Sequence, residues 1–485
     1  MLLPVSKINR RNFLAAAVSA IPAWMAQPSF VARHLTDRKL HLRVDLSHDG
    51  ARIPSDFLGL GYETSSVARP GLLSAENRVY VQLVQSLGPH GVIRVGGNTA
   101  DYASYSAHVR PLSSPEGKMG SIVNDGVLRD LGSFLRATGW KLIWTLNLGS
   151  RNQENSIAEA NAVAAAAGDH LLAFEIGNEP DLFPHRHRAA GYSYSEYLAE
   201  FRSYRDALRQ AIPGVTFAGP DAAGALDWVS KFATDEGRHV CLLTAHYYRD
   251  GAMKPTATMD ELLCDDPRLA AILRQLRAAS DSSRVPYRVC ETNSFYGGGK
   301  PGVSDTFAAA LWVLDFMFTL ACAGCAGVNL ETGVNQLGFI SSYSPIRDNE
   351  TGHYWAAPEY YGMHAFALSA GGRILDCAFD ASGRNIKAYA VKRAANELVL
   401  TLINKESGND GTVVIDGDSL PVRQAAIARL QAPSLKSKTG TTLGGVSVAA
   451  DGSWSPVQNE RLSPTGGSLY VRLPAASAAL VTLHM

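Results

Sequence analysis

The chain has 485 residues, of which 46% are hydrophobic and 19% are charged, and its 45 basic residues balance its 45 acidic residues. This length exceeds what one compact core usually holds, so it predicts one large domain and one smaller domain. The formal net charge of zero excludes a global electrostatic attraction to nucleic acid or to anionic membranes, so an acidic substrate would have to be held by local groups.

The first segment of the chain has the composition of an export signal. Arg10 and Arg11 precede an apolar, alanine-rich run over residues 15–25, which is too short to span a bilayer and is interrupted by Pro22. This pattern resembles a bacterial twin-arginine signal peptide. We therefore expect residues 1–26 to be a signal peptide, the protein to be periplasmic or secreted, and no membrane partner once the signal is removed.

Between about residues 55 and 345, short apolar runs alternate with longer stretches at helical spacing, such as 197–208 and 269–273. This alternation is typical of repeated β-strand and α-helix units. Eight strands are predicted, at residues 57–60, 91–94, 142–146, 172–176, 215–218, 240–243, 287–290 and 327–330. Eight parallel strands with outer helices form a TIM barrel. We predict an α/β fold with a (β/α)8 barrel over residues 50–370.

Beyond about residue 371 the pattern changes to short alternating strands separated by glycine and asparagine turns, as in 386–391, 398–402 and 469–473. This pattern predicts a β-sandwich domain over residues 371–485. The early run at residues 40–45 alternates in the same way. Residues 27–49 are therefore expected to be a linker and a strand that joins the β-sandwich.

Two glutamates follow predicted barrel strands. Glu179 stands between Asn178 and Pro180 after the fourth strand, and Glu291 follows the seventh. Pro180 cannot continue a regular strand or helix, so the Glu179 side chain is expected on a rim of the barrel. A pair of carboxylates is the minimum equipment for hydrolysing a glycosidic bond. Each glutamate alone is also compatible with a helix N-terminal acid or a surface loop charge, but the pair favours catalysis.

Four motifs in the correct order give residues 40–485 a resemblance to glycoside hydrolase family 79 of clan A, the β-glucuronidase and heparanase family. They are Arg94-Val95-Gly96-Gly97-Asn98, Asn178-Glu179-Pro180, His246-Tyr247-Tyr248 and Glu291-Thr292-Asn293-Ser294-Phe295-Tyr296-Gly297-Gly298-Gly299. The resemblance implies a retaining mechanism in which Glu179 is the general acid/base and Glu291 is the nucleophile. Such a mechanism requires the two carboxyl groups to lie about 5–5.5 Å apart.

The same resemblance implies roles for residues around the two glutamates. Arg94 and Tyr248 are expected to orient Glu291, with His246 as a further supporting residue. A barrel-end salt bridge is the alternative for Arg94, and simple packing is the alternative for His246. The candidate substrate contacts are Asn178, which is expected to bind the 2-hydroxyl, together with Glu63, Asn98, Tyr248, Tyr296, Gly297, Gly298 and Gly333.

The loops after the seventh and eighth strands bear on the substrate class. The backbone amides near Gly297 and Gly298 can form an anion-binding nest for a sugar carboxylate, as the resemblance implies, although a turn with positive φ would use the same glycines. The loop after the eighth strand lacks a tyrosine that some family members place near the carboxylate, and it carries Glu331 instead. An ionised, inward-pointing Glu331 would repel a uronate.

The sequence therefore predicts a β-glucuronidase that retains the anomeric configuration, needs no cofactor and no metal, acts on a carbohydrate and has no nucleic-acid partner. The enzyme alternatives share this mechanism but act on a neutral β-glycoside, or cleave inside an acidic glycosaminoglycan as heparanases do. A non-catalytic carbohydrate-binding protein is the alternative from a different class, and the presence of both glutamates argues against it. The oligomeric state is left open.

Overall fold

A computed structural model describes residues 39–108, 120–336, 341–416, 420, 422, 424–456 and 460–485. The expected signal peptide at residues 1–26 lies outside these described residues. Within them, no helix combines the length and the apolar character that crossing a membrane requires.

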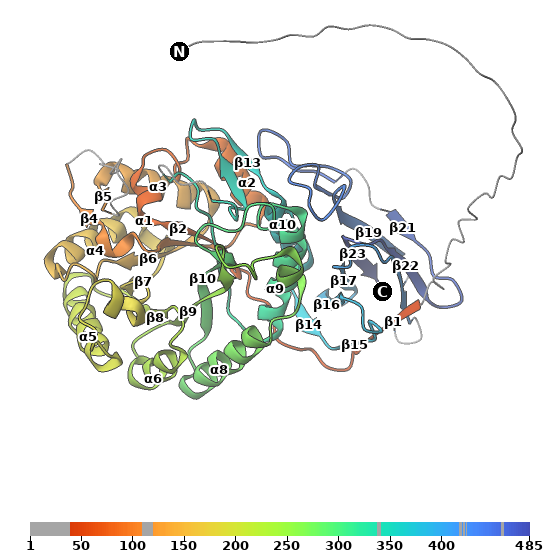
Figure 1. The fold of residues 1–485 in the computed structure, drawn as a ribbon, viewed down its shortest axis with the longest axis horizontal. Coiled ribbons are helices and arrows are strands. Elements are labelled where there is room, and N and C mark those ends of the chain that lie inside the picture. Colours follow the sequence, from red (N-terminus) through yellow and green to blue (C-terminus); the bar gives the residue numbers. More distant parts are fainter. Residues whose placement is uncertain are drawn as a thin grey trace, which may run out of the picture. The chain divides into compact units, whose positions relative to one another are not determined.

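Eight parallel strands form the central sheet (Figure 1). They follow the order β7-β6-β3-β2-β11-β10-β9-β8. The ring closes where Phe174 of β7 bridges Phe217 and its backbone N–H donates to the Thr216 carbonyl at 3.0 Å. The predicted (β/α)8 barrel is confirmed. Its strands are β2 (Leu58–Glu63), β3 (Val92–Gly96), β6 (Lys141–Leu146), β7 (Leu171–Ile176), β8 (Ala218–Ala222), β9 (Leu242–Gly251), β10 (Tyr287–Tyr296) and β11 (Val328–Glu331).

Three barrel strands differ clearly from the prediction. The strand predicted at residues 240–243 is β9, which runs from Leu242 to Gly251. The strand predicted at residues 215–218 is β8 at Ala218–Ala222, because the preceding residues contribute only an isolated bridge. The strand predicted at residues 287–290 is β10, which continues to Tyr296, so Glu291 lies inside a strand rather than after one. The longer strand forms because its residues pair with β9. The sequence of one strand does not reveal such pairing, so the prediction ended with the apolar run.

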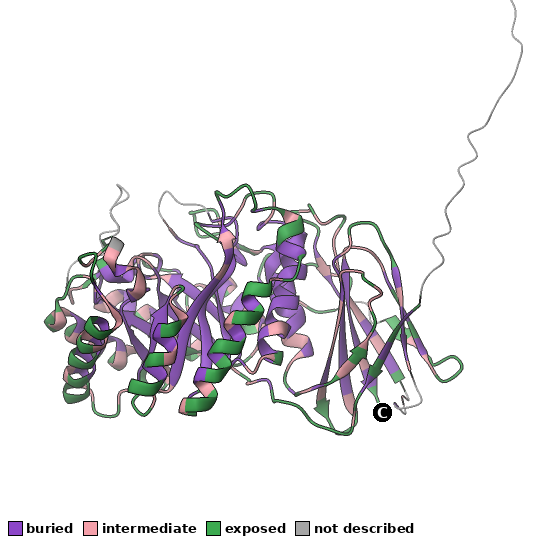
Figure 2. Cartoon of the chain, turned by 60° about the horizontal axis from the view of Figure 1, so that its bottom comes forward, coloured by how far each residue is buried: buried purple, intermediate pink, exposed green. Residues whose placement is uncertain are grey.

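Helices surround the barrel, and Figure 2 shows its strands buried while several outer helices expose one face to solvent. The helices are α1 (Thr64–Ala68), α2 (Arg78–Ser86), α3 (Asp125–Thr138), α4 (Gln153–Ala167), α5 (Tyr194–Ala211), α6 (Leu226–Glu236), α7 (Met259–Leu263), α8 (Pro267–Ser283), α9 (Phe307–Cys322) and α10 (Pro358–Ser369). Short 3-10 turns are η1 (Ala100–Tyr102), η2 (Gly168–His170) and η3 (Pro180–His185), and short strand pairs are β4 (Ser104–Tyr105) with β5 (Ile122–Val123) and β12 (Ile346–Asp348) with β13 (Tyr354–Ala356).

The C-terminal part consists of two sheets around a shared apolar core, which confirms the predicted β-sandwich. One sheet has the order β15-β1-β18-β22, and the other has the order β14-β16-β17-β23-β19-β20, with β21 beside β19. Strand β1 lies between β15 and β18, although it precedes the whole barrel in the chain. The strands are β1 (Lys39–Val44), β14 (Arg373–Leu375), β15 (Cys377–Phe379), β16 (Ile386–Ala394), β17 (Glu397–Asn404), β18 (Gly411–Ile415), β19 (Gln424–Gln431), β20 (Thr442–Leu443), β21 (Glu460–Leu462), β22 (Leu469–Leu473) and β23 (Ser477–His484).

The β-sandwich is joined to the barrel through α9. Asp315 of α9 accepts hydrogen bonds from Lys405 Nζ at 2.6 Å and from the Tyr389 hydroxyl at 2.6 Å, and Lys405 is only 4% exposed. A buried lysine requires a carboxylate partner of this kind, because an unpaired buried charge is strongly destabilising. The ion pair therefore ties the two parts of the structure together.

Candidate active site

A cavity of about 590 Å³ lies at the C-terminal ends of the barrel strands, which is the rim where enzymes with this fold carry their active sites. Both predicted catalytic residues, Glu179 and Glu291, line it. The predicted substrate contacts that also line it are Glu63, Asn98, Tyr248, Tyr296, Gly297 and Gly298.

Glu179 lies at the point where β7 gives way to the 3-10 turn η3. Its backbone is in the left-handed region, with φ 51° and ψ 53°, and its N–H donates to the Asp221 carbonyl at 3.0 Å. A non-glycine residue in this region is strained, and the following Pro180 excludes a regular continuation of the strand. This backbone conformation directs the Glu179 carboxyl group into the cavity, where it contacts His246 Nδ1 at 3.2 Å and Arg186 Nη1 at 3.3 Å.

Glu291 is positioned by a β-bulge. Val289 pairs with Ala245 of β9 and Glu291 pairs with His246, so Cys290 is an extra residue between them. Bulges at barrel rims redirect the side chains beside them. The Glu291 carboxylate accepts a hydrogen bond from Arg94 Nη1 at 2.7 Å on one oxygen and from the Tyr248 hydroxyl at 3.0 Å on the other. Donors on both oxygens hold this carboxylate in one orientation.

The two glutamates are close together. A carboxylate oxygen of Glu179, a carboxylate oxygen of Glu291 and a ring nitrogen of His246 all lie within 4.8 Å of one another. This spacing is short enough to raise the question of a metal ion. Arg94 already places a cation on Glu291, however, and both ring nitrogens of His246 have carboxylate partners. The arrangement therefore suits two reacting carboxyl groups better than three metal ligands.

Arg94 lies at the centre of a buried polar network beneath the cavity. Its side chain is completely buried, and each nitrogen of its guanidinium group has an acceptor. The acceptors are Glu175 at 3.2 Å, Glu291 at 2.7 Å, Asn178 at 2.8 Å and Asp221 at 2.6 Å. Both interpretations of Arg94 made from the sequence describe part of this geometry, because the same side chain is a barrel salt bridge and a partner of Glu291.

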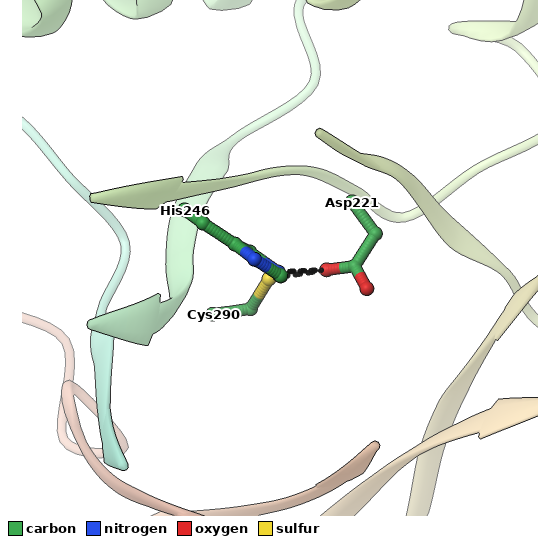
Figure 3. Close-up of side chains that lie close together, drawn as sticks. All are labelled: Asp221, His246 and Cys290. Carbon is green, nitrogen blue, oxygen red and sulfur yellow. Dashed lines mark hydrogen bonds and ion pairs between the residues drawn. The ribbon is translucent and has the colours of Figure 1, made fainter. Parts of the chain in front are cut away.

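Asp221 of β8 and Cys290 of β10 contact His246, which lies on β9 between these two strands (Figure 3). Both are bulge residues opposite β9, since Pro220 pairs with Thr244 and Ala222 with Ala245. Asp221 Oδ1 lies 2.7 Å from His246 Nε2, and the Cys290 thiol donates to the same oxygen at 2.8 Å.

The protonation states of this cluster follow from its surroundings. Burial acts to lower the pKa of His246, but the charges of Asp221 and Glu291 raise it well above its usual value. Burial acts to raise the pKa of Asp221, but Arg94 and His246 hold it below its usual range. Burial raises the pKa of Cys290, so this residue is a thiol that supports Asp221 and not a nucleophile. His246 is therefore an imidazolium ion beside Glu179.

Asp221 was not identified from the sequence. The signal available was the segment Gly219-Pro220-Asp221 after the fifth predicted strand, where the rim of a barrel is expected to carry functional side chains. Its bond to Arg94 places it in direct contact with the group that holds Glu291. Arg186, which contacts both Glu179 and the Asn98 side chain, was also missed, because it lies within a turn that has no periodic pattern.

Asn178 and Glu63 have different partners in the structure. The Asn178 carbonyl oxygen accepts from Arg94, while its Nδ2 is buried with no partner among the described residues, and Asn178 is not among the residues that line the cavity. The Glu63 carboxylate accepts from the Thr99 N–H at 2.8 Å, the Thr99 hydroxyl at 2.6 Å and the Asn98 N–H at 3.2 Å. Burial, opposed by the Thr99 hydroxyl, raises the pKa of Glu63 to about 7.

The glycine segment and Gly333 differ in their relation to the cavity. Gly297 and Gly298 have φ values of 82° and 86°, which side chains rarely adopt, and a Cβ on Gly297 would meet no atom within 4 Å. Glycine at Gly297 is therefore required by its backbone angle and not by crowding. Tyr296 is 52% exposed at the rim of the cavity. Gly333 lines a neighbouring cavity beside Arg347, so the structure does not bring it to the carboxylate pair.

Comparisons with known proteins place the chain among the glycosidases. Residues 388–480 match the model of the glycosyl hydrolase family 79 C-terminal beta domain. A β-glucuronidase of Aspergillus niger is 26% identical over 543 aligned residues, which cover 99% of this chain and 96% of that protein. A heparanase of Mus musculus is 26% identical over 263 residues, which cover 50% of this chain and 46% of that protein.

Solved structures share the fold. A 4-O-α-L-rhamnosyl-β-D-glucuronidase from Fusarium oxysporum has a TM-score of 0.77 at 20% identity, covering 92% of this chain and 100% of that chain. An arabinofuranosidase of family 51 from Xanthomonas axonopodis has a TM-score of 0.66 at 17% identity, with 92% and 100% covered. The combination of barrel and C-terminal β domain is therefore common to this chain and to several glycosidases.

Proposed function

We propose that this chain, a glycoside hydrolase whose residues 388–480 match the C-terminal beta domain of family 79, is a retaining β-glucuronidase, which releases glucuronic acid from a β-glucuronide. The observation that carries the proposal is the carboxylate pair, with oxygens of Glu179 and Glu291 within 4.8 Å of each other. Retaining glycosidases keep their carboxyl groups about 5–5.5 Å apart, whereas inverting ones separate them by about 6.5–9.5 Å to admit a water molecule. The pattern around Arg10 and Arg11 supports an exported, periplasmic or secreted enzyme.

In the first step, Glu291 attacks the anomeric carbon of the sugar. The bond from that carbon to the glycosidic oxygen breaks as a bond to the Glu291 oxygen forms, and Glu179 gives its proton to the departing oxygen. Arg94 and Tyr248 hold the attacking carboxylate in place through their bonds at 2.7 Å and 3.0 Å. Because this orientation exists before the substrate binds, little reorganisation is required during the reaction.

In the second step, water replaces Glu291 at the anomeric carbon. Glu179, now ionised, takes a proton from the water as the oxygen attacks, and Glu291 leaves as a carboxylate. His246 and Arg186 lie beside Glu179 and stabilise the negative charge that it carries between the two steps. Asn178 Nδ2, which has no partner among the described residues, is our candidate donor for the 2-hydroxyl, a contact that strengthens in the transition state.

A glutamine at position 179 should separate the two steps. For Glu179→Gln we expect kcat to fall about 10²- to 10⁴-fold on an alkyl β-glucuronide, whose leaving oxygen needs a proton. On p-nitrophenyl β-D-glucuronide the first step should survive, because p-nitrophenolate leaves unaided, so a burst of product should precede slow turnover. Stopped-flow absorbance would measure the burst, with Glu154→Gln on the exposed face of α4 as control. Absence of the burst on p-nitrophenyl β-D-glucuronide would contradict the assignment.

The proposed function itself is tested by comparing p-nitrophenyl β-D-glucuronide with the corresponding β-D-glucoside. We expect a higher kcat/KM for the glucuronide, and proton NMR of the early product should show the β-anomer before it mutarotates. Preference for the glucoside would favour a neutral-sugar glycosidase. Internal cleavage of an acidic polysaccharide, without turnover of either small substrate, would favour a heparanase-like enzyme. Binding without turnover of any of them would favour a carbohydrate-binding protein.

A further inference from the structure

Glu331 differs from the other carboxyl groups that face the cavity. Glu63, Glu179 and Glu291 each accept at least two hydrogen bonds or ionic contacts. Glu331, at the end of β11, is only 3% exposed, and neither of its side-chain oxygens has a partner among the described residues. A buried polar group without a partner in a ligand cavity calls for a partner from the ligand.

Two carboxylates and two cations act on Glu331 in its buried surroundings. Burial raises its pKa well above the usual value, Glu291 and Glu63 raise it further, and Arg94 and His246 oppose them. The titratable groups that act on it or are acted on by it are Tyr62 and Glu63 of β2, Arg94 of β3, His246 and Tyr248 of β9, Glu291 of β10 and Tyr343. Burial and the neighbouring carboxylates therefore favour the neutral form of Glu331, which has one O–H to donate.

Glu331 shares one wall of the cavity with the glycine segment. Asn293 Nδ2 donates to the backbone carbonyls of Glu331 at 3.0 Å and Tyr343 at 3.1 Å, and the adjacent Ser342 N–H donates to the Gly298 carbonyl at 2.6 Å. The Glu331 side chain packs against Gly61 of β2, where a Cβ would lie 2.5 Å from Oε2. The carboxyl group is thus held in place by packing, while its polar atoms stay without internal partners.

We infer that Glu331 is a specificity residue whose neutral carboxyl group donates a hydrogen bond to the carboxylate of the bound uronic acid. This inference rests on the proposed glucuronidase function and identifies the group that recognises the acid. A hydrogen bond from a carboxylic acid to a carboxylate is short and strengthened by charge. A neutral glucoside presents a hydroxymethyl group at the same place and forms only an ordinary hydrogen bond.

The inference has a definite pH dependence. While Glu331 is protonated, it donates to the uronate, and the ratio of kcat/KM for glucuronide to that for glucoside is high. As the pH rises through the pKa of Glu331, the O–H is lost and a second negative charge faces the uronate, so this ratio falls. The glucoside shares the catalytic groups, so taking the ratio removes their titration from the comparison.

Two variants of Glu331 test this assignment. In Glu331→Gln the amide still donates but cannot ionise, so the glucuronide should remain a good substrate and the ratio should become independent of pH. In Glu331→Ala the donor is gone, and kcat/KM for the glucuronide should fall roughly 10- to 100-fold, the range expected for a hydrogen bond to a charged group, with little change for the glucoside. Glu159→Gln is the matched control, because Glu159 is also buried with a pKa raised to about 7 but bonds Trp144 away from the cavity.

The outcomes separate failure of this inference from failure of the proposed function. If Glu331→Gln improves glucuronide hydrolysis at every pH, Glu331 is an ionised group that repels the acid, and the inference is overturned. Equal losses on both substrates would show that Glu331 contacts a hydroxyl group common to them. If folded wild-type enzyme hydrolyses the glucoside but not the glucuronide, the proposed substrate is wrong irrespective of position 331. Thermal melting of each variant checks that it is folded.

Discussion

Replacing Glu291 by glutamine is expected to lower kcat on p-nitrophenyl β-D-glucuronide by roughly 10⁴- to 10⁶-fold, the range found when an enzyme loses its nucleophile. Glutamine has nearly the same volume, but its amide cannot form a glycosyl-enzyme intermediate that water then resolves. It also turns a carboxylate that accepts from Arg94 and Tyr248 into a neutral group. Initial rates would measure the effect, and a thermal melt would check that the variant is folded. Glu159→Gln is the control.

A covalent label gives an independent check on Glu291. A 2-deoxy-2-fluoro glucuronide with a good leaving group slows both steps but allows the first, so wild-type protein should gain the mass of one sugar. Peptide mapping should place that mass on Glu291, and the glutamine variant should gain none. A label on Glu179, or substantial turnover by the variant, would refute the assignment of the nucleophile.

Replacing Arg94 by methionine is expected to lower the free energy of unfolding by about 3–5 kcal/mol, because removing one partner of a buried ion pair leaves uncompensated charge. Here the buried groups left behind are Glu175, Asp221 and Glu291. Urea denaturation followed by circular dichroism would measure the loss. Activity should fall as well, since Glu291 loses its 2.7 Å donor. Arg94→Lys should recover only part of both, because one ammonium group cannot reach four acceptors in a plane.

The control for Arg94 is Arg277→Met. Arg277 forms an exposed pair with Asp281 on α8, and pairs of that kind contribute roughly 0–1 kcal/mol. The pH dependence provides a further check. Arg94 helps to hold the pKa of Asp221 below its usual range, so the stabilisation is present above the unfolded-state value and is lost as the pH falls. The difference between wild type and Arg94→Met should therefore shrink in acid. A difference of the same size at every pH would contradict the ionic explanation.

The polar network beneath the cavity explains why the two glutamates can differ in role. Glu291 has a guanidinium ion and a phenol as partners, while Glu179 has His246 and the partly exposed Arg186. Asp221 bonds both Arg94 and His246, so one carboxylate positions the partners of both glutamates. The two carboxylates therefore have different surroundings, which is the condition for the two different roles proposed for them.

Most of the barrel strands were predictable because they are short buried runs bounded by turn residues, and such a run is a local property of the chain. The rim position of Glu179 followed from Pro180, since proline restricts the backbone whatever the tertiary contacts are. The end of β10 was not predictable, because the polar residues 291–294 interrupt its apolar run and are in the strand through pairing with β9. The bulges at Asp221 and Cys290 likewise exist only relative to a partner strand.

By itself, the sequence determined that this protein has a barrel followed by a β-sandwich, and that two glutamates stand at the same rim of the barrel. Periodicity and strand ends are sufficient for those conclusions, because the C-terminal ends of parallel strands meet at one edge. Only the tertiary structure decided that Asp221 joins the network, that Gly333 faces another cavity, and that Glu331 is buried with no partner in the part of the chain that the structure describes. Protonation and hydrogen bonding depend on distances between residues far apart in the chain, and those distances exist only in the folded protein.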